Sequence, residues 1–344
     1  MEKKNYEYQL SCLKKYGTNP LSYLTLSENL LIIRGGWDGY IAYKNHFKTA
    51  VVLGDPIVSD ESMQESVRDL KQALCASKYH ICFFLCKEKM KKPLRDEGFK
   101  GFCFGQDAIV NLNDFNLSGK KKWSIRSSVN YAKKHNMIVE EYKHISHRSK
   151  DTEDEIKKIS AEWIRMKKEP ELNFAFGHVD FEKNKEVRYF ISKHEGETTG
   201  FLTYYPIYGK NCYYLDLTRR KNDSPRGTID YLMVKSFEIL KKEGVEKIYI
   251  GCSPLFFQKL DPKINIRFTT VFFRAYTPFF GFLYPAKSEL FFKKKYATEW
   301  EPHYIFYYPR FSLRIFLSMI NAIYNGGIAS IIIHKFKYLK DNIF

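Results

Sequence analysis

The chain has 344 residues, of which 44% are hydrophobic, so it can bury a sizeable core and is not a disordered tail. Its 56 lysines and arginines exceed its 39 acidic residues, and the net charge of +17 favours an anionic partner such as nucleic acid, acidic lipid or polyphosphate. The seven cysteines contain no CxxC pair, which indicates reduced thiols rather than a zinc site or a disulfide framework. No signal peptide is expected, because the first residues lack an apolar run.

The first third of the sequence predicts strands followed by alternating helices and strands. Short apolar runs bounded by glycine, proline or aspartate indicate the strands, and apolar residues three or four positions apart indicate the helices. The predicted strands cover 30–36, 39–45, 49–58, 80–86 and 101–112, and the predicted helices cover 62–77 and 88–97.

A basic amphipathic helix is expected within residues 119–136. Between Phe115 and Val139 there are six lysines and arginines and no acidic residue, while Ile125, Val129 and Ala132 form an apolar stripe. Its arginine, Arg126, is a candidate contact for a phosphate backbone or a lipid headgroup. The competing interpretation is a simple charged surface.

The remainder predicts a second unit with a similar order of elements. Gly244 follows the second of its helices, where glycine commonly ends one. The predicted strands cover 137–142, 189–193, 198–205, 211–217 and 247–251, and the predicted helices cover 151–168 and 228–243. We therefore expect a mixed α/β (α+β) fold of two packed units, 1–136 and 137–344, that share a cleft.

One segment is long and apolar enough to raise the question of a membrane span. Residues 315–333 carry no charge, but two asparagines and a Gly-Gly pair interrupt them. We expect a helix, a break and a second short element. This pair either docks on the protein, lies in a membrane interface or crosses the bilayer.

The strongest candidate site lies at the end of a predicted strand. Asp216, Arg219 and Arg220 cluster there, and the helix that contains Asp230 begins a few residues later. Two guanidinium groups and a helix N-terminus favour a phosphate or carboxylate ligand, and Asp216 is suited to accept a proton or to bind an ammonium. A purely structural Asp–Arg pair is the competing interpretation.

A second candidate site is the lysine run 293–295, which is followed by the block 300–304. Lys293 and Lys295 share a face if this segment is extended, and nearby Trp300 and Tyr304 argue against a plain solvated run. The sequence contains no P-loop, HExxH, GxSxG or GxGxxG motif. Its nine histidines show no metal-ligand spacing, so we expect no metal site.

These motifs occur in the order of a known family. The blocks LDLTRR, PRGTIDYL, KKEGV, IGCSPL, FFKKKY and WEPHY resemble the catalytic domain of the aminoacyl-phosphatidylglycerol synthases, also called phosphatidylglycerol lysyltransferases. Upstream, VVLGDP, the basic helix segment and EWIRMKKEPELNFAFG resemble further blocks of that family. The resemblance covers roughly residues 20–335, and the order of the blocks is more specific than any single one.

The resemblance implies a fold, an activity and partners. The fold is a tandem of two acetyltransferase-like (GNAT) units. The activity is transfer of an amino acid, lysine or alanine, from aminoacyl-tRNA to a hydroxyl of phosphatidylglycerol or a related lipid. Because the aminoacyl ester is already activated, no cofactor or metal is expected. The sequence has no counterpart of the family's membrane domain, so the implied location is cytoplasmic, peripheral on the inner face of the cell membrane.

The resemblance also assigns residues by position. At position 303 the family's arginine is replaced by His303, which leaves the phosphate contact of that position without its usual residue. Cys252-Ser253 stands where the family has small residues. The implied catalytic residues are Asp216, Arg219, Lys293 and Lys295, and the candidate substrate-binding residues are Arg126, Arg220, Asp230, Ser253, Trp300, Glu301 and Tyr304.

Two other functions stay open at this stage. An acyl-CoA-dependent acyltransferase would share the fold, although the segment RRKNDSPRGT at 219–228 does not match the [QR]xxGx[GA] loop of such enzymes. A non-catalytic adaptor that binds tRNA or an anionic membrane would share the positive charge. Replacement of Asp216 separates this adaptor from an enzyme, because only the enzyme requires the carboxylate.

Overall fold

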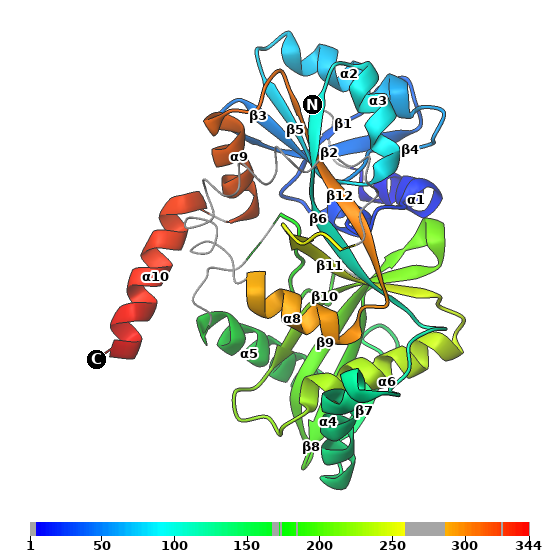
Figure 1. Cartoon of the computed structure of the whole chain (residues 1–344), viewed down its shortest axis with the longest axis vertical. Helices are drawn as coiled ribbons and strands as arrows, with labels where there is room; N and C mark the ends of the chain where they lie inside the picture. Colours follow the sequence, from blue (N-terminus) through cyan, green and yellow to red (C-terminus); the bar gives the residue numbers. More distant parts are fainter. Residues whose placement is uncertain are drawn as a thin grey trace.

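The computed structural model describes residues 5–166, 172, 174–183, 185–258, 286–324 and 326–343. In this part of the chain, twelve strands form a single sheet that runs the length of the molecule (Figure 1). Helices pack on both faces of the sheet, and the last helix extends away from the body. The expected mixed α+β class is therefore confirmed.

The first unit forms the upper part of the molecule in Figure 1. Strands β1, β2 and β3 are antiparallel, and β5 then runs parallel to β3 after a helical crossover. Its elements are α1 (Tyr6–Tyr16), β1 (Leu31–Ile33), β2 (Gly39–His46), β3 (Thr49–Leu53), β4 (Ile57–Val58), α2 (Met63–Cys75), β5 (His80–Cys86), α3 (Lys91–Asp96) and β6 (Lys100–Asn111).

The second unit repeats this order and is joined to the first by α4 (Trp123–Lys134). Strands β7 to β10 are antiparallel, and β11 runs parallel to β10 after a helical crossover. The two halves have related strand arrangements, as expected for a tandem of two packed units. The elements are β7 (Ile138–Tyr142), α5 (Lys150–Met166), β8 (Arg188–His194), β9 (Glu197–Ile207), β10 (Cys212–Arg220), α6 (Thr228–Lys242), β11 (Lys247–Pro254), α8 (Ala286–Tyr296) and β12 (Glu299–Tyr308).

The two units exchange their final strands. The order along the sheet is β1-β2-β3-β5-β12-β6-β11-β10-β9-β8-β7, so β12 of the second unit lies between β5 and β6 of the first. Strand β6 in turn pairs antiparallel with β11 of the second unit. The predicted boundary at residue 136 lies in the turn between α4 and β7 and stays a prediction. The crossing of β6 and β12 makes the sheet continuous.

Amphipathic helices cover the sheet as their sequence patterns predict. The apolar stripe of α4, formed by Ile125, Val129 and Ala132, is buried in one cluster with Leu232 of α6. Full burial of a side chain such as Ile125 or Val129 stabilises the fold by about 1.5–3 kcal/mol relative to leaving it exposed. The basic face of α4 is therefore left on the outside of the molecule.

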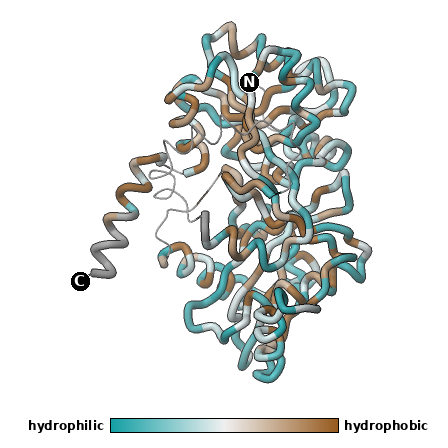
Figure 2. The backbone as a smooth tube through the Cα atoms, viewed as in Figure 1, coloured by the Kyte–Doolittle hydropathy of each residue, from teal (hydrophilic) through white to brown (hydrophobic). Residues whose placement is uncertain are grey.

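The uncharged segment 315–333 forms two helices with a break between them, as expected. In α9 (Leu313–Ile323), Ile315, Phe316 and Ile320 are buried, whereas Ile333 in α10 (Gly327–Ile343) is exposed. Figure 2 shows hydrophobic residues along the first part of α10. This helix is longer than the short element that the sequence predicted. Among the described residues, no helix is both long and apolar enough to cross a membrane.

Candidate active site

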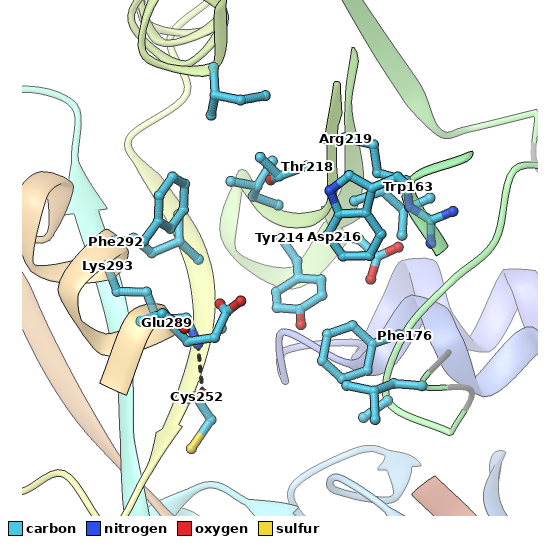
Figure 3. Close-up of a pocket in the computed structure, with 18 of the residues that line it drawn as sticks. Trp163, Phe176, Tyr214, Asp216, Thr218, Arg219, Cys252, Glu289, Phe292 and Lys293 are labelled. Atoms are coloured by element: carbon cyan, nitrogen blue, oxygen red, sulfur yellow. Dashed lines mark hydrogen bonds between the residues drawn. The ribbon is translucent and has the colours of Figure 1, made fainter. Parts of the chain in front are cut away.

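A cavity opens where two parallel strands diverge. Strands β10 and β11 pair with each other only as far as Tyr214 and Tyr249. Beyond these residues, β10 shifts its register against β9, and β11 shifts its register against β6. Gly251 lies at the irregularity in β11 with φ +92°, a conformation that side chains other than glycine rarely adopt. The resulting cavity has a volume of about 890 Å³ and is lined by α5, α6 and α8 as well as by both strands (Figure 3).

Asp216 projects into this cavity from the bulge in β10 (Figure 3). The N–H of Gly177 donates to its Oδ1 at 3.1 Å and to its Oδ2 at 3.0 Å. A side chain at position 177 would collide with Tyr205, because a Cβ built there lies 1.7 Å from its hydroxyl oxygen. Strand β10 ends at Arg220, three residues later than the predicted end at Leu217, so the cluster occupies the last residues of the strand.

Arg219 is buried beside Asp216 on β10, and its guanidinium lies against α5. It donates to the hydroxyl of Ser160 and lies 5.2 Å from the ring centre of Trp163. Both Arg219 and Trp163 line the cavity. These contacts hold a positive charge in the wall, next to an aromatic face.

The lysine run forms a helix, α8, so the two candidate lysines point in different directions. Lys293 is buried, and its Nζ donates to the carbonyl of Cys252 on β11 at 2.8 Å. Lys295 pairs with Asp230 in the first turn of α6 at 2.6 Å. Both lysines line the cavity, but they do not share a face as they would in an extended segment. Lys293 retains ammonium protons beyond the one it gives to the carbonyl.

Arg220 is exposed and stabilises the loop that leads into α6. Its guanidinium donates to the carbonyls of Lys221 and Asn222 and to the hydroxyl of Ser224. This loop and the first turn of α6 line the cavity. An anion bound there would meet the positive end of the helix dipole as well as Arg220.

Three other predicted substrate-binding residues, Trp300, Glu301 and Ser253, do not line this cavity. Trp300 packs on Phe256, with ring centres 4.4 Å apart, and Glu301 pairs with Lys87 at 2.8 Å. Burial would raise the pKa of Glu301, but Lys87 outweighs it and the pKa is lowered. The hydroxyl of Ser253 is buried and makes no hydrogen bond to any of the residues that the structure describes.

Two further predicted residues, Tyr304 and Arg126, also lie outside the cavity lining. Tyr304 packs in the core beneath α2 and α3, with the ammonium of Lys91 4.4 Å from its ring centre, and burial raises its pKa to about 12. Arg126 lies on α4, where its guanidinium binds the carbonyls of Leu117 and Gly119. It lines a separate hollow with Trp123 and other residues of that helix.

Comparison with known proteins supports the arrangement. The profile described as phosphatidylglycerol lysyltransferase, C-terminal, matches residues 11–307. The chain belongs to this family. The phosphatidylglycerol lysyltransferase of Bacillus subtilis is 26% identical over 330 residues, which cover 94% of this chain, and that of Staphylococcus xylosus is 26% identical over 299 residues, which cover 86%. The chain spans only 37% and 35% of these two relatives.

The fold is that of a solved lysyltransferase structure. L-PGS from Bacillus licheniformis superposes with a TM-score of 0.78 at 24% identity, covering 93% of this chain and 96% of that one. The resemblance seen in the sequence blocks is therefore confirmed at the level of family and fold.

The structure of this family member adds cavity residues that the sequence did not identify. They are Asp107 on β6, Trp163 on α5, Phe176, Tyr214 on β10 and Glu289 on α8. Figure 3 shows Tyr214 and Asp216 on the same strand and both directed into the cavity. Alternation along β10 would have indicated Tyr214, whereas the others come from elements that no local pattern brings together.

Proposed function

We propose that this chain transfers an aminoacyl group from aminoacyl-tRNA to a hydroxyl of phosphatidylglycerol. The observation that carries the proposal is the cavity between β10 and β11, whose lining includes the carboxylate of Asp216 together with Arg219, Lys293 and Lys295. The family of the chain and the names of its relatives support the same reaction. Lysine, the amino acid in those names, is the first donor to test.

The proposed reaction exchanges one ester for another. The lipid hydroxyl oxygen bonds to the carbonyl carbon, the bond from that carbon to the ribose oxygen breaks, and the lipid proton ends on the ribose oxygen. Asp216 accepts the lipid proton and returns it to the ribose, or alternatively binds the α-ammonium of the amino acid. Lys293 supplies positive charge for the oxyanion or for the lipid phosphate. Neither role needs a metal or a nucleotide, because the ester is already activated.

In this proposal, Arg219 and Lys295 act by keeping charges and helices of the site in place. Arg219 is held by Ser160 and Trp163, so its charge stays fixed in the wall as the reaction proceeds. Lys295 neutralises Asp230 and fixes α8 against α6. A prearranged electrostatic site of this kind lowers the barrier without reorganisation at the moment of reaction.

The outer face of α4 is the proposed contact for tRNA. Trp123 and Tyr131 are exposed there, and Lys134 lies on the same face one turn further along. The preceding turn adds Lys120 and Lys121, and the sequence from Phe115 to Val139 contains no acidic residue. Lysines bind phosphates, and exposed aromatic rings stack on unpaired bases, so this combination suits an RNA end.

Helix α10 is the proposed contact for the membrane. Ile332, Ile333 and Phe336 are exposed along it, and the sequence around them is basic. An amphipathic helix with exposed apolar residues and flanking lysines suits the surface of an anionic bilayer. This would place the enzyme peripherally at the cytoplasmic face, where both substrates are available.

The direct test uses purified protein, phosphatidylglycerol vesicles and tRNA charged with radiolabelled lysine. Label that enters the chloroform phase, and that is lost when the tRNA is first treated with RNase, supports the proposal. Mass spectrometry of the product then identifies the lipid and the amino acid. Repeating the assay with alanyl-tRNA measures the preference between the two amino acids. Absence of transfer from every charged tRNA to any anionic lipid would refute the proposal.

A further inference from the structure

The two exchanged strands meet at a buried histidine–aspartate pair. His303 of β12 and Asp107 of β6 are 1% and 2% exposed, and both line the cavity. The Nε2 of His303 lies 3.0 Å from Oδ2 of Asp107, and its Nδ1 lies 3.0 Å from the carbonyl oxygen of Leu85. By the resemblance described above, His303 occupies a position at which the family has arginine. Both of its nitrogens are already occupied within the protein, so it acts through its neighbours and does not itself contact substrate.

The partners of His303 fix how many protons its ring carries. A backbone carbonyl only accepts, so Nδ1 must carry a proton. The same carbonyl also accepts a hydrogen bond from Nδ2 of Asn19 at 3.1 Å. Leu85 has a φ of +61°, in the left-handed region of the backbone. A neutral imidazole would then direct the bare lone pair of Nε2 at the carboxylate of Asp107. That arrangement is repulsive, so the pair holds one further proton.

The surroundings place this proton on the histidine. Lys87 lies 4.0 Å from Oδ2 of Asp107 and favours the carboxylate form. Burial would raise the pKa of Asp107, but the hydrogen bond and charge of His303, together with Lys87, outweigh it and the pKa is lowered. Other charged and titratable groups that interact with Asp107 among the described residues are Lys293, Tyr249, Cys252 and Glu301, and Asp55 accepts from the backbone N–H of Lys87.

We propose that His303 is an imidazolium that replaces the arginine cation of the family and keeps the cavity wall beside Lys293 neutral. Asp107 faces Cys252 across the β6–β11 pairing, and the carbonyl of Cys252 holds the ammonium of Lys293. With the shared proton, the pair contributes no net charge. Without it, the pair contributes one buried negative charge next to the lysine that is proposed to meet the lipid phosphate. His303 is thus a positioning residue for Asp107 and sets the electrostatics of the lipid site.

The first experiment measures the protonation state directly and does not depend on activity. Long-range ¹H–¹⁵N spectra of protein labelled with ¹⁵N-histidine are recorded at pH 7.5, and His303→Arg assigns the signal by its disappearance. We expect both ring nitrogens of His303 to resonate as protonated. A bare Nε2 at this pH would overturn the inference. If His303→Arg does not fold, variants of the other eight histidines assign the signal by elimination.

The second experiment measures the consequence for the lipid and rests on the proposed function. The KM for phosphatidylglycerol vesicles is measured at pH 7.5 for wild type, His303→Arg and His303→Gln. The arginine variant is expected to match wild type, because it keeps the positive charge, and the KM of the glutamine variant is expected to be raised roughly tenfold. The KM for aminoacyl-tRNA should not change. A glutamine variant with the wild-type KM for the lipid would contradict the inference, whereas absence of transfer in all three proteins would count against the proposed function and leave the NMR result to decide.

Discussion

The backbone N–H of Gly177 donates to both carboxylate oxygens of Asp216, at 3.1 and 3.0 Å. Hydrogen bonds to a carboxylate favour its ionised form, and they also fix its direction. The carboxylate is consequently held toward the cavity by a loop that approaches β10 from outside the sheet. The following predictions begin from this contact.

Asp216→Asn is expected to lower transfer by about 10² to 10⁴, because the amide cannot accept a proton or carry the charge. Initial rates with charged tRNA and phosphatidylglycerol vesicles measure this loss. Asp223→Asn is a matched control, since Asp223 is exposed and does not line the cavity. An Asp216→Asn variant with full activity would exclude Asp216 from the chemistry.

The same variant separates the two proposed roles of Asp216. A donor whose α-ammonium is replaced by a hydroxyl cannot form an ion pair with the carboxylate. If Asp216 binds the ammonium, the substitution has little effect on transfer from this donor. If Asp216 moves the lipid proton, the loss is the same for both donors. The ratio of the two rate losses therefore identifies the role.

Gly177→Ala is expected to reduce both stability and transfer, because its Cβ would lie 1.7 Å from the hydroxyl oxygen of Tyr205 and 2.8 Å from Oδ2 of Asp216. The double variant Gly177→Ala/Tyr205→Leu removes the hydroxyl and the ring atom Cζ, which would lie 2.6 Å from the Cβ, and should recover part of the loss. Thermal melts and initial rates measure both effects. Gly36→Ala is the control, since no atom lies within 4 Å of a Cβ at that position. Equal effects at 36 and 177 would show that the loop contact is unimportant.

Lys134→Glu and Trp123→Ala on α4 are expected to weaken tRNA binding. For the lysine variant, the slope of log affinity against log salt should become shallower by roughly one unit, as expected for one lost phosphate contact. The tryptophan variant should weaken binding with little change in that slope, because stacking is not ionic. Lys100→Glu makes the same charge change on an exposed strand end of the first unit. If Lys100→Glu weakens binding equally, the attraction comes from net charge alone.

Ile333→Asp and Phe336→Asp are expected to reduce binding to anionic vesicles by tenfold or more, because each removes about 1.5–3 kcal/mol of apolar burial. Vesicle co-sedimentation measures the change, and transfer to a water-soluble acceptor should be unaffected. Phe47→Asp is a matched control, with a side chain that is 61% exposed against 70% for Phe336. Unchanged sedimentation of both α10 variants would exclude this helix as the membrane contact.

Local sequence patterns predicted most elements of the fold, because each of those elements satisfies its own periodicity. The helical stripe of Val67, Leu70 and Leu74 and the runs 80–86 and 228–243 correspond closely to α2, β5 and α6. The segment 291–296 was ambiguous, since three lysines suit neither a buried strand nor a buried helix. It is helical, and this separates Lys293 from Lys295.

The site was predicted only where its residues are close in sequence. Asp216, Arg219 and Asp230 lie on one strand and the helix that follows it, so a single motif identifies them. Asp107 and His303 meet only because β12 lies beside β6. Nothing in the local sequence around either residue indicates that pairing, which depends on the order of strands in the whole sheet.

The strand exchange has a consequence for how the protein is made. Strand β12 begins at residue 299, yet it pairs with β5 and β6 of the first unit. During synthesis, β5 and β6 of that unit therefore stay without their common neighbour until residues 299–308 have left the ribosome. Unpaired strand edges can pair with the wrong strand. The nascent first unit therefore has to avoid association with nascent chains on adjacent ribosomes of the same messenger RNA. Neither unit is complete until the other has been made.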